Sequence, residues 1–292
     1  MKSANALRSG KGHKDENFPV ASRVIAARHR PLILAFYEFV RVADDISDHA
    51  ALAADEKIRR LDRLEANLLG QGDEEPEAIR LRAALAERGM SPRHPCDVLK
   101  AFRLDVTKLR YANWSELIHY CTYSAMPVGR FVLDVHEEAT TTWAASDALC
   151  AALQINNHLQ DCGKDYRNLN RVYITEDVLS ARGARVEDLD ADTASPALRL
   201  CIQDMIPGTE RLLRESEPLA AEVHDMRLAM EIRVIQIYAE RILARLKTRD
   251  PLRDHVHLRP WEMLLYGLMG MASGLVRHAV RKPAASRPVS SN

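Results

Sequence analysis

Two acid-rich segments have the residue types and spacing to hold divalent cations and a phosphate group. The first runs from Tyr37 to Asp48 and contains Arg41, Asp44 and Asp45. At 100° per residue, the side chains of Arg41, Asp44 and Asp48 fall within an arc of about 60° on one helix face. A helix here would therefore present a cation and two carboxylates to one ligand.

The second segment combines amide and carboxylate side chains in the same way. Gln154, Asn157, Asp161 and Asp165 fall within an arc of about 80° on a helix. Gly163 lies between the two aspartates and costs a helix about 1 kcal/mol relative to alanine. This glycine indicates either the close approach of a ligand or a fraying helix end.

The sequence around both segments points to metal chemistry. Residues 32–36 and 148–153 are apolar enough for interior helices, and carboxylates carried into an interior need a compensating cation. Oxygen ligands without cysteine favour Mg²⁺, which commonly bridges to substrate phosphates, and Arg41 would donate to the same phosphate. Two alternatives stay open: an ion-pair patch on the surface, and a di-iron bundle, which needs more than the single Glu-x-x-His motif at 116–119.

The hydrophobic periodicity predicts an all-α protein with one compact domain. Alternating strand-like runs are almost absent, and the breaks between helical segments are short. We predict a polar N-terminal segment (1–17), a helical domain (18–281) and a disordered tail (282–292). The expected helices cover residues 31–49, 55–70, 76–88, 95–109, 114–136, 143–165, 194–217, 220–248 and 259–281.

Composition excludes several classes of partner. The chain has 292 residues with 41 Lys and Arg against 41 Asp and Glu, so no net charge attracts nucleic acid from a distance. The five cysteines form no CxxC pair, which is typical of reduced thiols in a cytoplasmic protein. The N-terminus lacks the apolar core of a secretory signal.

The uncharged run from Met263 to Val276 is too short to span a bilayer. We expect this run to pack in the protein core. The alternative is a lipid-facing surface, which would place the protein peripherally on the inner face of the membrane.

With these residues identified, the chain resembles the squalene/phytoene synthase family over residues 12–281. Within it, the sequence is most similar to the hydroxysqualene synthases of hopanoid biosynthesis. That similarity is carried by the opening segment at 11–22 and by the segment at 160–174, which continues the second aspartate motif into Arg171-Val172-Tyr173.

The resemblance implies an isoprenoid synthase fold, a single helical bundle with a central cavity and two aspartate motifs facing each other across its mouth. The metal ligands would be Asp44, Asp45, Asp48, Asn157, Asp161 and Asp165. The catalytic residues would be Arg41, Tyr120, Arg171 and Tyr173. The substrate would contact Phe18, Tyr37, Arg41, Val128, Gly129, Gln154, Asn157 and Arg171.

The family also implies an activity. Several Mg²⁺ ions would assist ionisation of presqualene diphosphate, and water would capture the rearranged cation to give hydroxysqualene, with NADPH not expected. The alternatives are a synthase of presqualene diphosphate, squalene or phytoene, and a non-catalytic helical assembly factor. Partners would be the prenyl diphosphate substrate, an upstream presqualene diphosphate synthase and a downstream enzyme of the desaturase or reductase type.

Two positions depart from the family pattern. Pro127 follows Tyr120 in the helix that lines the cavity, and a proline there bends the helix. Asp250-Pro251 interrupts the segment 247–258, where relatives carry a cavity-facing tyrosine, so that tyrosine's role is not assigned to any residue here.

Overall fold

The computed structural model describes residues 25–280, and every regular element in that range is helical, as predicted. Phe18 and the predicted terminal segments 1–17 and 282–292 lie outside the described residues. The elements are α1 (Arg30–Asp48), α2 (Ala54–Leu68), α3 (Pro76–Glu87), α4 (Arg93–Thr107), α5 (Trp114–Ser124), α6 (Met126–Val135), η2 (Thr140–Thr142), α7 (Trp143–Gln160), α8 (Cys162–Leu169), α9 (Glu176–Arg182), η3 (Val186–Asp190), α10 (Pro196–Ser216), α11 (Leu219–Glu222), α12 (Met226–Leu246) and α13 (Pro260–Ala279).

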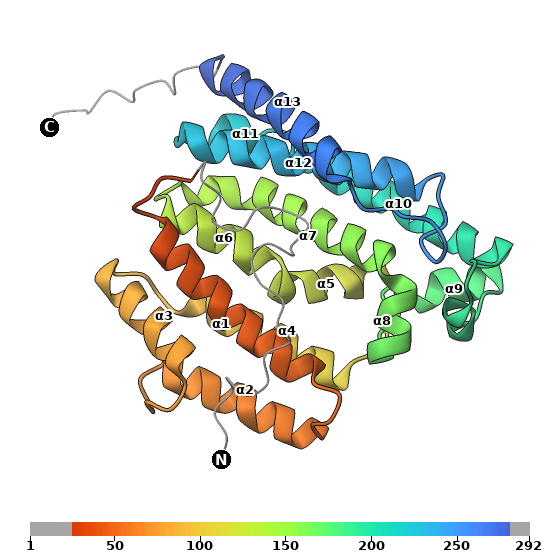
Figure 1. The fold of residues 1–292 in the computed structure, drawn as a ribbon, viewed down its shortest axis with the longest axis horizontal. Helices are drawn as coiled ribbons and strands as arrows, with labels where there is room; N and C mark the ends of the chain where they lie inside the picture. Colours follow the sequence, from red (N-terminus) through yellow and green to blue (C-terminus); the bar gives the residue numbers. More distant parts are fainter. Residues whose placement is uncertain (1–24, 281–292) are drawn as a thin grey trace, which may run out of the picture.

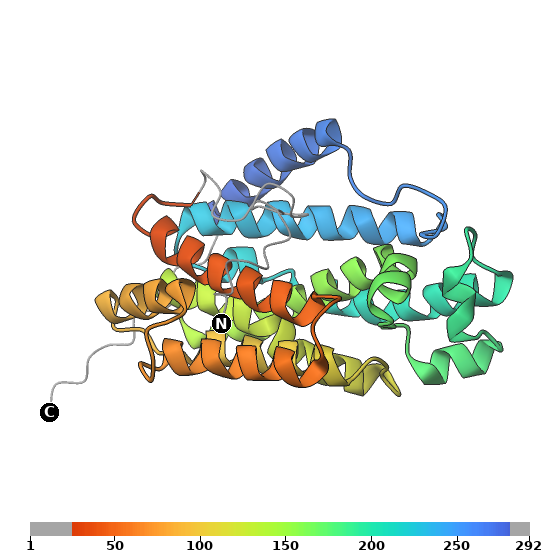
Figure 2. The ribbon, with the colours of Figure 1, turned by 60° about the horizontal axis from the view of Figure 1, so that its bottom comes forward.

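The helices form a layered bundle with two hydrophobic cores. In Figures 1 and 2, α1 to α4 make up one part, α5 to α7 lie in the middle, and α10 to α13 cover the other side. One core joins α1 to α4 with part of α6, and the larger core lies mainly between α5 and α12. The two aspartate segments, on α1 and on α7 with α8, therefore belong to different halves of the bundle.

The sequence of α1 explains how its aspartates are positioned. Apolar side chains at helical spacing, including Ile33, Phe36 and Phe39, are buried against the rest of the α1–α4 core. Phe36 also stacks on Phe131 of α6, with ring centroids 4.0 Å apart. The polar side chains occupy the opposite, half-buried face of the same helix.

Three of the predicted helices are each divided into two. The helix expected at 114–136 is two helices that break at Ala125, because Pro127 can occupy only the first turn of the second. The helix expected at 143–165 breaks at Asp161, and that expected at 220–248 is divided into α11 and α12. Helix α9 was not predicted, because its seven residues are too few for a clear periodic pattern.

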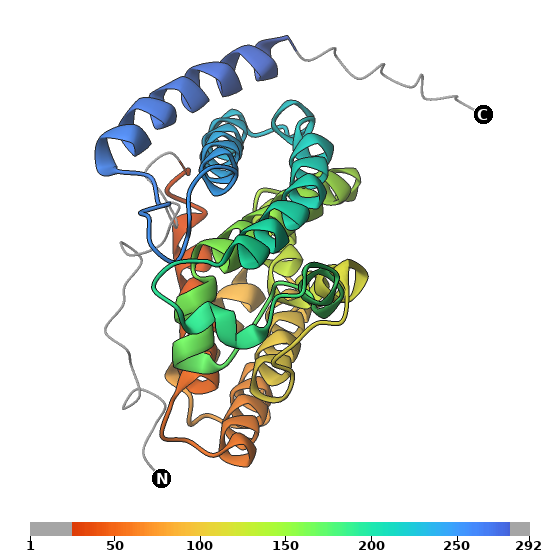
Figure 3. The same cartoon turned by 90° about the vertical axis from the view of Figure 1, so that its right-hand side faces the viewer.

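The expectation of a core position for Met263–Val276 is wrong. Within α13 only Glu262, Gly270 and Gly274 are buried, and most of the large apolar side chains are exposed. The helix packs mainly on α12 and lies on the outside of the bundle in Figure 3. No helix in residues 25–280 is both long and apolar enough to cross a membrane.

Candidate active site

The first aspartate motif is held together by an arginine within its own helix. Arg41 Nη1 lies 2.6 Å from Asp44 Oδ2, and its Nη2 lies 3.2 Å from Asp45 Oδ1. Burial and the neighbouring carboxylate of Asp48 nevertheless raise the pKa of Asp44 to about 7. The motif therefore concentrates more negative charge than Arg41 neutralises, and a cation would relieve that repulsion.

The second motif lies where α7 gives way to α8. Asp161 is the junction residue, and Asp165 lies in the first turn of α8. Histidines accompany both aspartates: His257 Nε2 is 3.8 Å from Asp161 Oδ1, and His158 Nδ1 is 3.7 Å from Asp165 Oδ2. Gln154 Nε2 lies 2.9 Å from the other ring nitrogen of His158, so this predicted substrate residue belongs to the same cluster.

Gly163 has a packing role in this motif. A Cβ atom at this position would lie 2.5 Å from Leu252 Cδ2 and 3.2 Å from the carbonyl oxygen of Leu189. The atoms that approach Gly163 closely therefore belong to the protein itself and not to a ligand. Helix α8 continues past this glycine to Leu169.

Arg171 connects the two motifs. Helix α8 ends at Leu169. The next residue, Asn170, adopts a left-handed conformation with φ of 54°, and the chain then turns back along residues 109–111. Arg171 Nη1 donates to Asp48 Oδ1 at 2.7 Å, and its Nε donates to the backbone carbonyl of Asp105 at 3.2 Å. In Figures 1 and 3, α8 lies next to the carboxyl end of α1, as this bond requires.

Asp105 is a site residue that the sequence reasoning missed. It is buried on α4 and accepts a hydrogen bond from the hydroxyl of Tyr120 at 2.8 Å. Burial raises the pKa of Asp105 to about 6, although the charge of Arg171 and the Tyr120 bond act in the opposite direction. Burial also disfavours the charge of Arg171, but the carboxylates of Asp105 and Asp48 outweigh it and raise the pKa of the guanidinium.

An aromatic cluster lies beside this charged network. Tyr173 stacks on His158 with ring centroids 3.3 Å apart and planes 9° apart, and its ring centroid lies 5.7 Å from that of Tyr111 and 5.9 Å from that of Tyr120. Burial raises the pKa of Tyr120 and of Tyr173 well above the ordinary value for tyrosine. Both phenols therefore keep their protons at neutral pH, with the hydroxyl of Tyr120 bound to Asp105 and the ring of Tyr173 stacked on His158.

The remaining residues predicted to contact the substrate differ in their burial and in the helices that carry them. Tyr37 and Asn157 are half-buried on the two motif helices, and Val128 is half-buried against the α1–α4 core. At Gly129 a Cβ atom would lie 2.5 Å from both Ser146 Oγ and Cys150 Sγ, so the glycine is needed for α6 to pack on α7. Substrate contact by these four residues stays a prediction.

Asp105, His158, His257 and Tyr111 join the site without having been predicted. For Asp105, the available signal was a lone acid among the apolar residues of α4. His158 lies one helical turn after Gln154, on about the same face of α7. Neither feature distinguishes a functional residue from a buried polar residue whose hydrogen bonds only stabilise the core.

A second group of ligand-type side chains lies far from the aspartates. Within the described part of the chain, His29, His136 and Asp225 are the only three such residues whose ligand atoms converge to within 4.8 Å. Burial, His136, Arg28 and Arg88 together lower the pKa of His29 to about 4. Both ring nitrogens of His29 lie within 3.3 Å of an arginine nitrogen, which opposes binding of a cation there.

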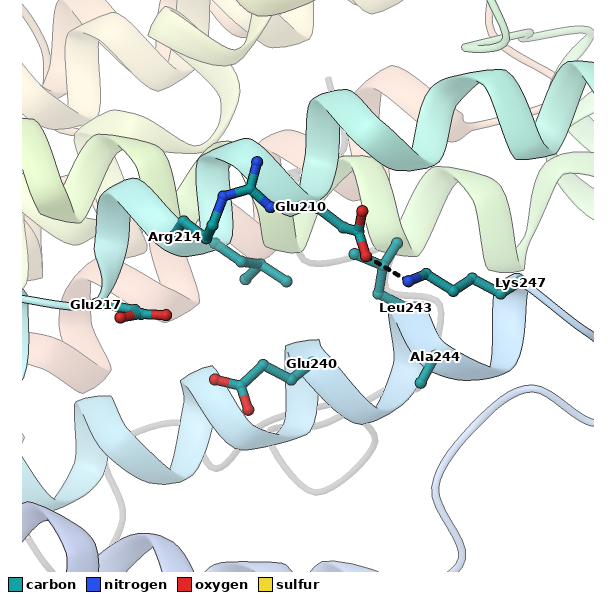
Figure 4. A pocket seen from close by; sticks show the side chains of 8 residues that line it. Glu210, Arg214, Glu217, Glu240, Leu243, Ala244 and Lys247 are labelled. Atoms are coloured by element: carbon teal, nitrogen blue, oxygen red, sulfur yellow. Dashed lines mark hydrogen bonds and ion pairs between the residues drawn. The ribbon is translucent and has the colours of Figure 1, made fainter.

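A surface groove between α10 and α12 is unsuited to a prenyl chain (Figure 4). Charged side chains of both signs line it, and Lys247 and Glu210 form an ion pair across it. The aspartate motifs are therefore the better candidate site.

An all-α bundle with two aspartate motifs joined through an Arg-x-Tyr segment defines a class of enzymes that act on prenyl diphosphates. The sequence model described as "Squalene/phytoene synthase" matches residues 11–262, and the chain belongs to this family.

Relatives in this family match nearly the whole chain. The chain is 62% identical to the hydroxysqualene synthase of Rhodopseudomonas palustris, over 99% of each protein. It is 46% identical to the hydroxysqualene synthase of Zymomonas mobilis, over 93% of this chain and 92% of the relative.

Among solved structures, the squalene synthase HpnC of Alicyclobacillus acidocaldarius superposes with a TM-score of 0.71 at 30% identity, covering 84% of this chain and 91% of the other. A dehydrosqualene synthase superposes with a TM-score of 0.75 over 92% of this chain and 94% of the other, and at 20% identity it supports the fold alone. The expected isoprenoid synthase fold is confirmed.

Proposed function

We propose that this protein is a hydroxysqualene synthase that converts presqualene diphosphate and water into hydroxysqualene and pyrophosphate. The observation that carries the proposal is the 62% identity to an enzyme of that name over 99% of both chains. The connected aspartate motifs support it, because they place charged groups where a diphosphate would bind. A non-catalytic assembly factor would have no need of this buried charged network.

The donor atoms fit magnesium. Asp44, Asp48, Asp161 and Asp165 supply carboxylate oxygens, and Asp45 and Asn157 lie beside them. Burial first, and the neighbouring carboxylate of Asp48 second, raise the pKa of Asp44, and a bound cation would offset both effects. Bound Mg²⁺ would supply positive charge to neutralise the departing diphosphate.

The arginines would hold the diphosphate group. Arg41 and Arg171 already lie at the first motif, where their forked guanidinium groups pair with carboxylates. A diphosphate is a stronger competitor for such groups because it carries more charge and presents several acceptor oxygens. The C–O bond to the diphosphate would break, and the electron pair would leave with the pyrophosphate.

The aromatic cluster would protect the resulting carbocation. The π-faces of Tyr120 and Tyr173 stabilise positive charge, and their protonated hydroxyl groups are weaker nucleophiles than phenolates. Water then forms the new C–O bond and loses a proton. The reaction balances without a reductant, so NADPH is not required.

A second candidate is reduction of the same cation to squalene. The solved structure at 30% identity is named a squalene synthase, which favours this alternative over phytoene synthesis. An enzyme that joins two prenyl diphosphates head to head must supply the substrate in either case. An enzyme that desaturates or reduces an isoprenoid alcohol would consume hydroxysqualene. We also propose a cytoplasmic protein that works at the membrane surface, because its substrate and product are lipids.

Product analysis separates the candidates. The protein would be incubated with Mg²⁺ and presqualene diphosphate in ¹⁸O-labelled water, with and without NADPH. We expect hydroxysqualene with one labelled oxygen under both conditions. Squalene that forms only with NADPH would support the second candidate. Turnover of farnesyl diphosphate without turnover of presqualene diphosphate would overturn both.

A further inference from the structure

Helix α13 presents a continuous apolar face to solvent. At 100° per residue its large exposed side chains fall within an arc of about 160° that runs the length of the helix. The exposed fraction reaches 60% at Trp261, 68% at Leu264 and 62% at Val276. The complete stripe consists of Trp261, Leu264, Leu265, Leu268, Met269, Leu275, Val276 and Val280.

Close packing of the opposite face of α13 on α12 holds the apolar side chains toward solvent. A Cβ atom at Gly270 would lie 2.7 Å from Val234 Cα, and one at Gly274 would lie 2.7 Å from Met230 Cα. The helix therefore rests its smallest side chains on the backbone of α12 and turns its largest ones outward. An ordinary surface helix does the reverse, since burying apolar side chains is what holds it in place.

The first turn is anchored by polar contacts. Glu262 pairs with Arg245 of α12 and accepts a bond from the backbone N–H of Arg259. The hydroxyl of Tyr238 donates to the carbonyl oxygen of Met263 at 2.5 Å. Rotating α13 to bury its apolar stripe would break these contacts and drive larger side chains into α12.

The charges of α13 and of the positions that flank it are mainly positive. The single acid of α13, Glu262, is buried and already paired. Arg259 precedes the helix, and Arg277 and His278 lie in its last turn. From position 259 to the end, the sequence contains five Lys and Arg residues and one acid, although the whole chain is neutral.

We propose that the α13 face is a membrane-docking surface that lies in the headgroup region of an anionic bilayer. Twenty residues at 1.5 Å per residue give a helix about 30 Å long, which can bury its apolar side in that region. Arg277 also donates to the backbone carbonyl of Glu217 at 3.0 Å, so the cations at the ends of α13 would attract the anionic surface from outside the apolar contact. Trp261 at one end is the residue type typical of such an interface. The family match ends at residue 262, so this surface lies almost wholly beyond it.

The charge pattern favours lipid over a second copy of the chain. Both ends of α13 are cationic, so any symmetric pairing of two such helices would bring cations together. An anionic bilayer would bury the apolar stripe and also attract the cations. The proposal deepens the membrane position given above, but it does not depend on which product the enzyme makes.

Sedimentation with vesicles tests the surface directly. Wild-type protein would be mixed with vesicles of phosphatidylcholine alone or with added phosphatidylglycerol, at low and at physiological salt. We expect binding to the anionic vesicles that weakens as salt rises. The double variant L264D/L268D should lose at least about tenfold in partitioning, because it removes two exposed leucines that the membrane contact would bury.

Matched controls keep this test decisive. Leu69 and Leu200 are exposed apolar residues outside α13, so L69D/L200D should bind vesicles like wild type. All variants should keep the wild-type circular-dichroism spectrum and melting temperature. The shift in tryptophan fluorescence on binding should disappear in Trp261→Phe, which leaves Trp114 and Trp143 as the remaining tryptophans.

Three results would overturn the proposal. Wild-type protein that does not bind anionic vesicles is the first, and equal binding by L264D/L268D is the second. The third is a dimer in solution that L264D/L268D dissociates while vesicle binding is absent, which would assign the face to a second copy. Product formation in detergent is measured separately, so failure here leaves the proposed reaction unaffected.

Discussion

Arg171 Nη1 lies 2.7 Å from Asp48 Oδ1, although 123 positions separate the two residues in the sequence. This bond fastens the segment after α8 to the carboxyl end of α1. The same guanidinium contacts the backbone of Asp105, so one residue touches α1 and α4 from the end of the second aspartate motif. The arrangement would let a diphosphate bound at one motif be sensed at the other.

Replacing Arg171 by lysine tests this connection. Lysine keeps the charge but cannot reach Asp48 and the Asp105 carbonyl with a fork, so we expect kcat/KM for presqualene diphosphate to fall about 10²-fold or more. Steady-state kinetics would measure the change. Arg182→Lys is the matched control, because Arg182 pairs with Asp204 on the exposed side of α9, and its kinetics should stay within about twofold of wild type. Unchanged kinetics for Arg171→Lys would remove its assigned role.

The stability contributed by Asp105 should depend on pH in a defined direction. Its pKa is raised to about 6 in the folded protein, above the ordinary value near 4, so folding favours the protonated form. The cost of burying the ionised form is therefore absent at low pH and develops as pH rises from about 4 to about 6. Asp105→Asn does not ionise, and its unfolding free energy relative to wild type should increase over this range by on the order of 2 kcal/mol.

Denaturant unfolding at a series of pH values would measure this difference. Asp204→Asn is the control, because Arg182 lowers the pKa of the exposed Asp204 below its ordinary value. Its stability relative to wild type should stay nearly constant from pH 5 to pH 7.5, since this group titrates at lower pH. A difference between Asp105→Asn and wild type that is flat from pH 5 to pH 7.5 would contradict the raised pKa.

The glycines of α13 should differ in their tolerance of alanine. Alanine favours a helix by about 1 kcal/mol over glycine, but at Gly270 its Cβ would lie 2.7 Å from the backbone of Val234. We expect Gly270→Ala to lower the melting temperature because backbone cannot yield easily. At Gly267 the nearest atom is the Tyr238 hydroxyl at 3.1 Å, so Gly267→Ala should have little effect or stabilise. Equal melting temperatures for the two variants would contradict the packing of α13 on α12.

Local periodicity was sufficient to predict the all-α fold and the face of α1 that carries the first motif. Apolar residues at helical spacing bury one side of α1, which leaves Arg41, Asp44 and Asp48 together on the other. The breaks at Ala125 and Asp161 were harder to place. Proline suits both the first turn of a new helix and a kink within one. Gly163 indicated either a close approach or a helix end, and it lies two residues after the break at Asp161.

Contacts between distant segments could not be predicted from the sequence. Asp105 becomes part of the site only because α4, α5 and the segment after α8 meet in space. The core position expected for α13 was wrong because an uncharged run of 14 residues is equally compatible with a protein core and with an interface. The glycines of α13 show which face of the helix is buried, but only when the position of α12 against them is known.

Release of pyrophosphate from presqualene diphosphate is the most direct test of the central claim that aspartates from two helices act together on a diphosphate. With Mg²⁺, wild-type protein should release one pyrophosphate for each hydroxysqualene formed, and chelation of the metal should stop release. Asp44→Asn and Asp161→Asn should each slow release by about 10³-fold while keeping the helical circular-dichroism signal. Asp55→Asn, which alters an exposed acid on α2, should release pyrophosphate at the wild-type rate. Wild-type rates without divalent cations, or in either motif variant, would contradict the account.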